Sequence, residues 1–457
     1  MPTLITPLSG WGRYPVQTCE LQRPERYADL RPDDSVSLIA RGQGRSYGDA
    51  ALNENGRVLL TERVNRLLDF DLERGILRAE AGVTLAEILN VIVPKRWFLP
   101  VTPGTKFVSL GGCVAADVHG KNHHHEGSFG AHILVLELIL ADGSRVACSA
   151  TKNPQLFWAT VGSMGLTGII GEVTLQLVPI SSAYMMVRHH VAVDLEQLFE
   201  HLQNPALDDR YTVAWIDSLA SGKNLGRGIA MCGHHAAAQE LPRGFGNTFA
   251  RKSERSHSMP FDLPAWTLNP QSIGAFNALY YQLAGSKQQP FLSGYDSYFY
   301  PLDAISNWNR LYGKRGFVQY QCVIPEATAF EGVKTLLHEL SASRRPSFLA
   351  VLKRLGAQDN GMLSFPMAGY TLALDLPIRD EGLFALLDKL DEIVLLHGGR
   401  VYLAKDARLS AEHFRAMYPR YDEWRKIKNE IDPGNYFNSS LARRLQIPGN
   451  TALAKRY

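Results

Sequence analysis

The sequence predicts an α+β protein with two domains. Its 457 residues are more than one ordinary hydrophobic core accommodates. Up to about residue 180, short apolar runs are separated by glycine-rich loops. Farther on, the pattern changes to strands with alternating apolar and polar residues, such as 211–216 and 317–324, mixed with helices, such as 328–343 and 381–398. We therefore predict a first domain over 1–180, completed by 400–457, and a second domain over 181–399 built on an antiparallel sheet.

The elements of the first part follow from local patterns. Residues 36–40 are an apolar run that ends at "ARGQGRSYGDAAL", which predicts a buried strand feeding a glycine loop. Thr84 as N-cap, with Glu87 three residues later, predicts a helix from there to residue 94. A second glycine loop follows at 102–112. The run "ILVLELILADGSRVACS" has an Asp-Gly turn between two apolar segments and predicts a β-hairpin.

The second part contains one long polar stretch. Residues 241–290 are rich in Pro, Ser and Gly, and a stretch of this length is either a mobile lid or a disordered insertion. Near the end of the chain, a helix is expected to stop at Asp432-Pro433-Gly434.

Composition excludes several classes of protein. With 48 basic and 45 acidic residues the net charge is +3, which is no nucleic-acid footprint. The five cysteines are an odd number without a CxxC pair, so neither a disulfide framework nor a zinc cluster is expected. No secretory signal or bilayer-spanning run is visible, so we expect a cytoplasmic enzyme.

The glycine loop at 42–48 raises the question of what its backbone approaches. Its spacing is neither the dinucleotide-binding G-x-G-x-x-G that opens a helix nor a P-loop. A glycine nest can still cradle a pyrophosphate, while a tight turn is the alternative. Further glycines at 103–105, 111–112 and 165–169 favour a large flat cofactor held from several sides over incidental turns between hairpins.

The segment "HGKNHHH" invites a metal hypothesis, which its spacing does not support. Three consecutive histidines on a strand cannot all face one ion, and no His-x-x-x-His spacing is present, so we expect no metal. His123, His124 and His125 are expected to form a surface run. His119 ends the mostly apolar run "CVAADV" and is expected to be buried and positioned.

Other polar residues occur in apolar strands. The segment "YLAKDARLS" places Lys405 within a predicted strand, and "FLAVLKRLG" does the same for Lys353. A lysine in a dry site loses proton affinity and becomes a base or a cation for an anionic substrate, although a solvent-facing strand lysine is the common case. Gln319 and Gln321 share one strand face, which suits recognition of sugar hydroxyls.

Taken together, these segments resemble a known family. The stretches "ARGQGRSYGDAAL", "PVTPGTKFVSLGGCVAADVHGKNHH", "LFWATVGSMGLTGII", "FVQYQCVIP", "GGRVYLAKDAR" and "DPGNYFNSSLARRL" occur in the order found in FAD-dependent oxidoreductases of the vanillyl-alcohol oxidase type. They are most similar to the decaprenylphosphoryl-β-D-ribose 2-oxidases. The resemblance covers residues 40–442, nearly the whole chain, and implies a FAD-binding domain and a substrate (cap) domain.

The resemblance also implies which residues surround the cofactor. The FAD-lining positions are Ala40, Arg41, Gly42, Gln43, Gly44, Arg45, Ser46, Tyr47, Gly48, Asp49, Ala50, Gly104, Ser109, Leu110, Gly111, Gly112, Ala116, Asp117, Val118, His119, Ile169 and Tyr402. Many relatives attach FAD through a histidine at the place that Arg45 occupies here, so we expect non-covalent FAD.

The implied reaction oxidises the C2 hydroxyl of a polyprenylphosphoryl ribose, as half of an epimerisation that yields an arabinose donor for cell-wall arabinan. Lys405 and His119 are the expected catalytic residues, with their roles interchangeable. Gln319, Gln321, Lys353 and Tyr300 are expected to bind substrate. The implied partner is an NADH-dependent keto-reductase.

Three alternatives and one departure accompany this assignment. The polar insertion could touch a bilayer surface through Arg251, Lys252 and Arg255, although a solvated loop is the simpler interpretation. The protein could instead be a soluble alditol or sugar oxidase that uses oxygen, or a non-catalytic FAD- or glycan-binding protein. Ala373 stands where mycobacterial relatives have a cysteine captured by covalent inhibitors, so insensitivity to that capture is expected.

Overall fold

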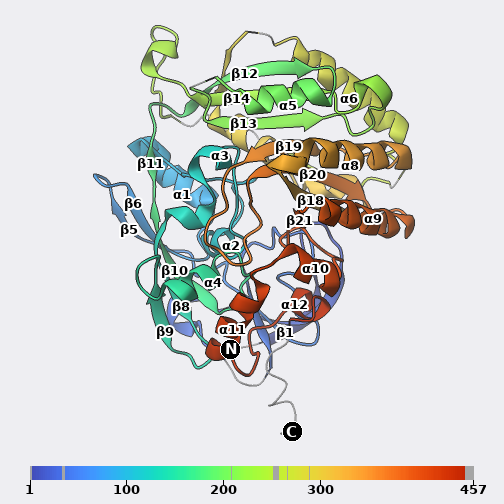
Figure 1. Cartoon of the computed structure of the whole chain (residues 1–457). Helices are drawn as coiled ribbons and strands as arrows, with labels where there is room; N and C mark the ends of the chain where they lie inside the picture. Colours follow the sequence, from blue (N-terminus) through green and yellow to red (C-terminus); the bar gives the residue numbers. More distant parts are fainter. Residues whose placement is uncertain are drawn as a thin grey trace.

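The computed structural model describes residues 3–32, 36–206, 208–250, 257–264, 266–287 and 289–447. It is an α+β structure with three main sheets, and the C-terminal helices lie in the lower half of the view (Figure 1). Arg251, Lys252 and Arg255, the basic residues of the predicted insertion, lie outside the described residues.

The first sheet positions the glycine loop. Its strands, in spatial order, are β1 (Thr3–Ser9), β2 (Val16–Gln22), β4 (Arg57–Leu60) and β3 (Leu38–Arg41). β4 pairs in parallel with both neighbours, and β3 ends where the loop begins. Leu38 and Ile39 are fully buried, which confirms the predicted strand in this region.

The second sheet is antiparallel and closes the first part of the chain. Its order is β5 (Leu67–Asp71), β6 (Ile76–Glu80), β10 (Ile169–Gln176), β8 (Ile133–Ile139) and β9 (Arg145–Cys148). β8 and β9 form the predicted hairpin. Two short strands, β7 (Trp97–Phe98) and β11 (Val178–Pro179), pair beside it.

The third sheet has eight strands, and its paired neighbours are antiparallel as predicted for the middle of the chain. Its order is β16 (Phe291–Gly294), β12 (Tyr184–Ala192), β14 (Gly228–His235), β13 (Tyr211–Ile216), β19 (Ala350–Leu355), β20 (Gly369–Pro377), β18 (Phe317–Pro325) and β21 (Arg400–Val401). The predicted boundary at residue 400 therefore falls on the last strand of this sheet.

Helices cover one face of the eight-stranded sheet and leave most of the other face to a cavity. Side chains alternate along a strand, so Ala214 and Ile216 of β13 pack in the core formed with α5 (Leu195–Gln203), α8 (Ala329–Ser343) and α9 (Gly382–Leu396). Trp215 points to the opposite face, together with α6 (Pro270–Gly285). The predicted helices near 328–343 and 381–398 are confirmed.

The remaining helices connect the sheets. They are α1 (Leu85–Ile92), α2 (Leu110–Ala115), α3 (His123–Glu126), α4 (Pro154–Thr160), α7 (Tyr295–Phe299), α10 (Ala411–Met417), α11 (Tyr421–Ile431) and α12 (Ser440–Arg444). The capping box of α1 is present, since Thr84 accepts from the Glu87 N–H and Glu87 accepts from the Thr84 N–H. α11 ends just before Asp432, as predicted.

Two predicted loops contain helix instead. The loop predicted over 102–112 ends early because the Ser109 hydroxyl caps the N-terminus of α2, which makes Leu110 to Gly112 its first turn. The stretch 241–290, predicted to be a lid or disordered, contains α6, a helix of 16 residues capped by Asn269. Its apolar residues pack on β12 and β14, a tertiary contact that local composition does not reveal.

The end of the chain is fixed to the glycine-loop strand by a buried ion pair. Asp432 accepts bonds from Lys428 Nζ and from the backbone N–H groups of Tyr436 and Phe437, the latter two at 2.8 Å. The Leu38 N–H in turn donates to the Tyr436 carbonyl at 2.8 Å. The turn after α11 thus positions β3.

We expect Asp432→Asn to lower the free energy of unfolding by about 3 kcal/mol, because it leaves the buried Lys428 ammonium without its counter-charge. Asp422→Asn breaks an exposed ion pair with Arg425 and is the matched control, expected to stay within about 0.5 kcal/mol. Urea denaturation followed by tryptophan fluorescence makes the comparison. Equal losses in both variants would contradict the role assigned to Asp432.

Candidate active site

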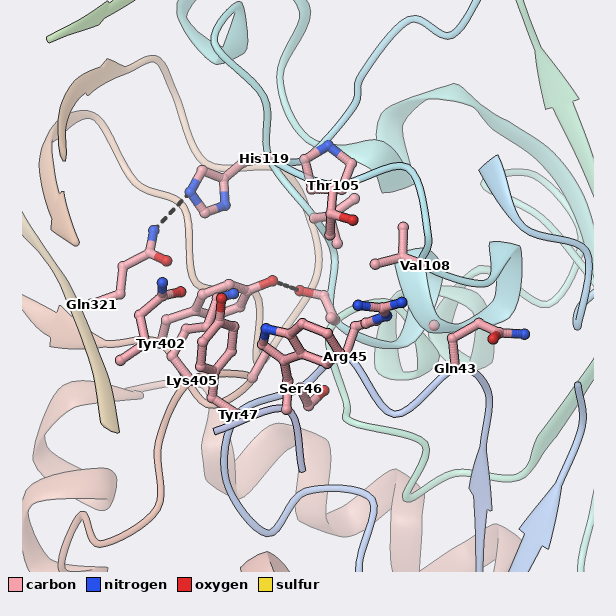
Figure 2. A pocket seen from close by; sticks show the side chains of 18 of the residues that line it. Gln43, Arg45, Ser46, Tyr47, Thr105, Val108, His119, Gln321, Tyr402 and Lys405 are labelled. Carbon is pink, nitrogen blue, oxygen red and sulfur yellow. Dashed lines mark hydrogen bonds between the residues drawn. The ribbon is translucent and has the colours of Figure 1, made fainter. Parts of the chain in front are cut away.

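A cavity of about 390 Å³ lies where the glycine loop, the segment before α2 and the open face of the eight-stranded sheet meet. Loop residues 40–47 form one wall, and side chains of β13, β19, β20 and β18 form another. Figure 2 shows Lys405 and Tyr47 together on one side of the cavity, with His119 and Gln321 across from them.

The glycine loop presents unpaired backbone donors to this cavity. Among the described residues, no backbone N–H from Gly42 to Ser46 has a hydrogen-bond partner. A Cβ at Gly42 would overlap the Ser109 hydroxyl, so only glycine lets the loop approach α2 this closely. Gly44 has φ +61°, the left-handed region that favours glycine. These features fit the phosphate-cradle alternative better than a simple hairpin turn.

Most of the predicted cofactor positions line the cavity. Those in contact with it are Ala40, Arg41, Gly42, Gln43, Gly44, Arg45, Ser46, Tyr47, Ala50, Gly104, Ser109, Gly111, Gly112, Ala116, Val118, His119 and Tyr402. Arg45 stacks over Trp11 at 4.0 Å. Tyr402 donates its hydroxyl to the Ala116 carbonyl at 2.7 Å and stacks on Phe365.

The other predicted cofactor positions lie behind the cavity wall. Asp49 pairs with Arg444 at 2.7 Å, and Gly48 sits against the backbone of Asp406. Asp117 accepts bonds from the Ser128 hydroxyl and the Gly130 N–H. Leu110 is a buried core residue, and Ile169 is paired in β10 while its neighbour Ile170 reaches the cavity.

His119 is buried, as its position after an apolar run predicts, and Gln321 holds its ring. Gln321 Nε2 lies 2.9 Å from His119 Nε2 and 3.1 Å from the Thr371 hydroxyl. Because an amide nitrogen donates, His119 Nε2 accepts and the ring proton lies on Nδ1. That Nδ1 is buried and has no partner among the described residues. Burial, helped by Lys353, holds the pKa of His119 well below its usual range, so the ring is neutral.

Lys405 faces the cavity from a turn, and the predicted strand was wrong. β21 ends at Val401, and the Lys405 N–H donates to the Tyr402 carbonyl at 2.9 Å. The ammonium group lies 4.0 Å from the centre of the Tyr47 ring, on the face that attracts cations. Burial lowers the pKa of Lys405 to about 7, against the opposing charge of Asp375.

Two further lysines add positive charge. Burial lowers the pKa of Lys353, which projects from β19, to about 8. Burial and the neighbouring Lys353 lower the pKa of Lys121 to about 7, and its ammonium donates to the Tyr298 carbonyl. Lys121 and Lys353 both line the cavity. An anionic ligand would compensate these charges.

Asp375 is the main residue that the sequence reasoning missed. It is fully buried in β20 and accepts bonds from Gln319 Nε2 at 2.5 Å and from the Tyr312 hydroxyl at 3.3 Å. Burial raises the pKa of this carboxyl to about 7, although Gln319 and Lys405 oppose the shift. A lone carboxylate in the apolar run "YTLALDLP" was the available signal.

Tyr300 lies one layer behind the cavity. Its hydroxyl is 2.6 Å from that of Thr102, which does line the cavity. It therefore reaches the site through Thr102.

The histidine run is not entirely on the surface. His123 is buried, and its Nδ1 accepts the Gly356 N–H at 3.0 Å because α3 turns it inward; the surface prediction for His123 was wrong. In the described part of the chain, the one group with metal-like spacing is Asp208, Asp209 and His234, away from this cavity. Arg188 already pairs with both of its carboxylates.

Comparison with known proteins places the chain in a family. A model described as FAD binding domain matches residues 15–149. The chain is 36% identical over 456 residues to the decaprenylphosphoryl-beta-D-ribose oxidase of Mycolicibacterium smegmatis, with 98% of each chain covered. This protein belongs to the decaprenylphosphoryl-β-D-ribose oxidase family. It is an FAD-dependent oxidoreductase.

More distant relatives extend the same comparison. The oxidoreductase is 35% identical to an uncharacterized protein of Streptomyces coelicolor, over 80% of this chain and 100% of that one. It is 24% identical to an L-gulonolactone oxidase of Scyliorhinus torazame, over 87% and 86% of the two chains. A model described as D-arabinono-1,4-lactone oxidase matches residues 379–445, which include Lys405.

The residues of this oxidoreductase fit FAD. The free N–H groups from Gly42 to Ser46 can neutralise a pyrophosphate without a metal. Gly104 has open space around it, with nothing within 4 Å of the position a Cβ would take.

We expect Gly42→Ala to lower the ratio of bound flavin to protein at least about tenfold, because the added methyl group pushes the loop away from Ser109. Gly434→Ala is the matched control, since nothing surrounds that position within 4 Å. The absorbance ratio of the purified variants at the flavin and protein bands measures this. Full flavin content in Gly42→Ala would contradict the cradle.

Proposed function

We propose that this protein oxidises the C2 hydroxyl of a polyprenylphosphoryl ribose to the 2-keto sugar. The observation that carries the proposal is one cavity in which Lys405 faces the Gln321–His119 pair beside a glycine loop with free backbone donors. The 36% identity to the oxidase of Mycolicibacterium smegmatis supports the same substrate class.

FAD supplies the hydride acceptor for this reaction. Neutral Lys405 takes the proton of the sugar hydroxyl, for which a pKa of about 7 is well matched. His119 orients the flavin or the sugar by donating a hydrogen bond to it from the free Nδ1–H. Gln319 and Gln321 orient the sugar hydroxyls. Lys353 binds the phosphate, with Lys121 adding charge. Burial of these groups keeps water from competing for them.

The fold supports the vanillyl-alcohol oxidase arrangement in this proposal. We assign the four- and five-stranded sheets to a FAD-binding domain over 1–180, completed by 400–457. The eight-stranded sheet, apart from its edge strand β21, is assigned to a substrate domain over 181–399. The cavity lies between these sheets, so one domain would hold the cofactor and the other would bind the sugar.

A soluble sugar or lactone oxidase that uses oxygen is the second candidate. The similarity to an L-gulonolactone oxidase and to the D-arabinono-1,4-lactone oxidase model supports it. Three lysines around the cavity favour a phosphorylated substrate instead. Rapid peroxide formation with a soluble lactone or alditol would favour this second candidate. The buried base argues against a purely binding role.

The keto product of the first reaction requires a reducing partner. We propose an NADH-dependent keto-reductase that returns the C2 carbonyl to a hydroxyl of opposite configuration, and a cytoplasmic location for this protein. Within the described residues, no helix is both long and apolar enough to cross a bilayer.

We expect Lys405→Met to slow reduction of the bound flavin about 10²- to 10⁴-fold, since the base is removed while the shape is kept. In the unmodified protein, the rate of flavin reduction should be low at pH values below about 7, where Lys405 is protonated. It should rise as the pH passes through about 7 and Lys405 loses its proton. Stopped-flow absorbance measures both effects. Lys389→Met, at an exposed ion pair, is the control. An unchanged rate in Lys405→Met would remove it as the base.

We expect acid precipitation to release all of the flavin into the supernatant. Arg45 occupies the place of the attachment histidine, and it is held over Trp11. Nε2 of His119, a cavity-lining imidazole, is engaged by Gln321. Absorbance of the supernatant and mass spectrometry of the pellet make the measurement. A protein mass increased by one FAD would contradict non-covalent binding.

A further inference from the structure

The helix α6 and the segment before it expose a set of large apolar side chains. We call this set the apolar rim and define it as Phe261, Trp266, Phe276, Leu279 and Leu283. Trp266 is 73% exposed, Phe261 62%, Leu283 59% and Leu279 55%. Soluble proteins seldom expose several large apolar side chains in one part of the surface, and such groups of side chains mark interaction sites.

α6 differs from an ordinary surface helix because its 16 residues include no charged side chain. Ile273 and Ala284 face the sheet, whereas Phe276, Leu279 and Leu283 follow helical spacing on an outer side. The helix therefore carries apolar residues on two sides. Burial against its own sheet explains only one of them. In Figure 1, α6 lies at the upper right of the molecule, far from the C-terminal helices.

The inner side of the same helix reaches the cavity. Tyr280 lines the cavity and packs on Trp215 at 4.7 Å between ring centres. Cross-strand neighbours lead from Trp215 through Val351 and Ala373 to Gln321. One row of the sheet thus runs from the polar catalytic end to an apolar end at α6.

The segment before α6 is also linked to the cavity wall through a strand pair. The exposed Pro301 and its neighbour Leu302 line the cavity. Just beyond them, β17 (Ile305–Ser306) pairs with β15 (His257–Ser258), from which the chain continues to Phe261 and Trp266. The β15–β17 pair therefore links the chain at the cavity wall to the segment that carries Phe261 and Trp266.

We infer that the apolar rim docks on the surface of a lipid bilayer. An uncharged helix with exposed leucines and a nearby tryptophan suits the boundary between headgroups and acyl chains. When the protein is docked there, the isoprenoid chain of a substrate can remain in the lipid. The sugar of that substrate can then pass along Trp215 to Gln321. The passage of substrate rests on the proposed function, but binding of the bilayer does not.

Co-sedimentation with vesicles of phosphatidylcholine and phosphatidylglycerol tests the docking. Leu279→Glu/Leu283→Glu in the full chain should lower the bound fraction at least about tenfold, since two charges enter the interface. Leu396→Glu is the matched control, because Leu396 is 82% exposed at the end of α9 on the other face of the sheet. It should bind vesicles as the unmodified protein does.

Two results would overturn the inference. One is equal vesicle binding, or none, by all three proteins. The other is a dimer in sedimentation equilibrium that only the double variant converts to a monomer, since a second copy would then cover the rim. Equal melting temperatures of the variants confirm that the fold is kept.

A third assay separates failure of this inference from failure of the proposed function. With a short-chain, water-soluble polyprenylphosphoryl ribose, the double variant should reduce its flavin at the unmodified rate. With a long-chain substrate held in vesicles, the flavin of the double variant should be reduced more slowly, in proportion to its loss of vesicle binding. If the short-chain substrate reduces the flavin of no variant, the proposed function fails and the vesicle binding result still stands.

Discussion

The site depends on the burial of basic groups around one cavity. Lys121, Lys353 and Lys405 are half-buried in the cavity wall, and each has a pKa well below that of a free lysine. Burying an ammonium group is costly unless an opposite charge compensates it. Asp375 supplies part of that compensation, and its complete burial in β20 raises its own pKa to about 7. A phosphate-bearing ligand would supply the rest. The same burial that weakens proton affinity at Lys405 therefore favours an anionic substrate.

The rest of the fold positions the walls of this cavity. The eight-stranded sheet places Gln319, Gln321 and Lys353 on one face, and Asp375 orients Gln319 from the neighbouring strand. The first sheet brings the glycine loop to the opposite wall, and the turn after α11 holds its strand in place. Gly42 permits contact between that loop and α2. The cofactor cradle and the substrate wall are thus made by segments far apart in the sequence.

Local patterns predicted much of this arrangement. Strand periodicity placed both glutamines on one face, and glycine spacing singled out the loop that faces the cavity, because each pattern depends on neighbours in the sequence. The prediction of a strand around Lys405 was wrong, because the chain turns there and Lys405 contacts Tyr47, which is distant in the sequence. His123 faces inward because Gly356 approaches it, and α6 forms where it packs on β12 and β14. Asp375 was overlooked because its partners, Gln319 and Tyr312, lie far from it in sequence.

The most direct test is one visible spectrum of the purified protein, recorded before and after anaerobic addition of a short-chain polyprenylphosphoryl ribose. We expect a flavin spectrum that bleaches on addition, because Lys405 then takes the proton of the C2 hydroxyl while the hydride reduces the flavin. A flavin spectrum that does not change would contradict the proposed substrate. The absence of flavin, even after FAD is supplied, would contradict the interpretation of the glycine loop as its cradle.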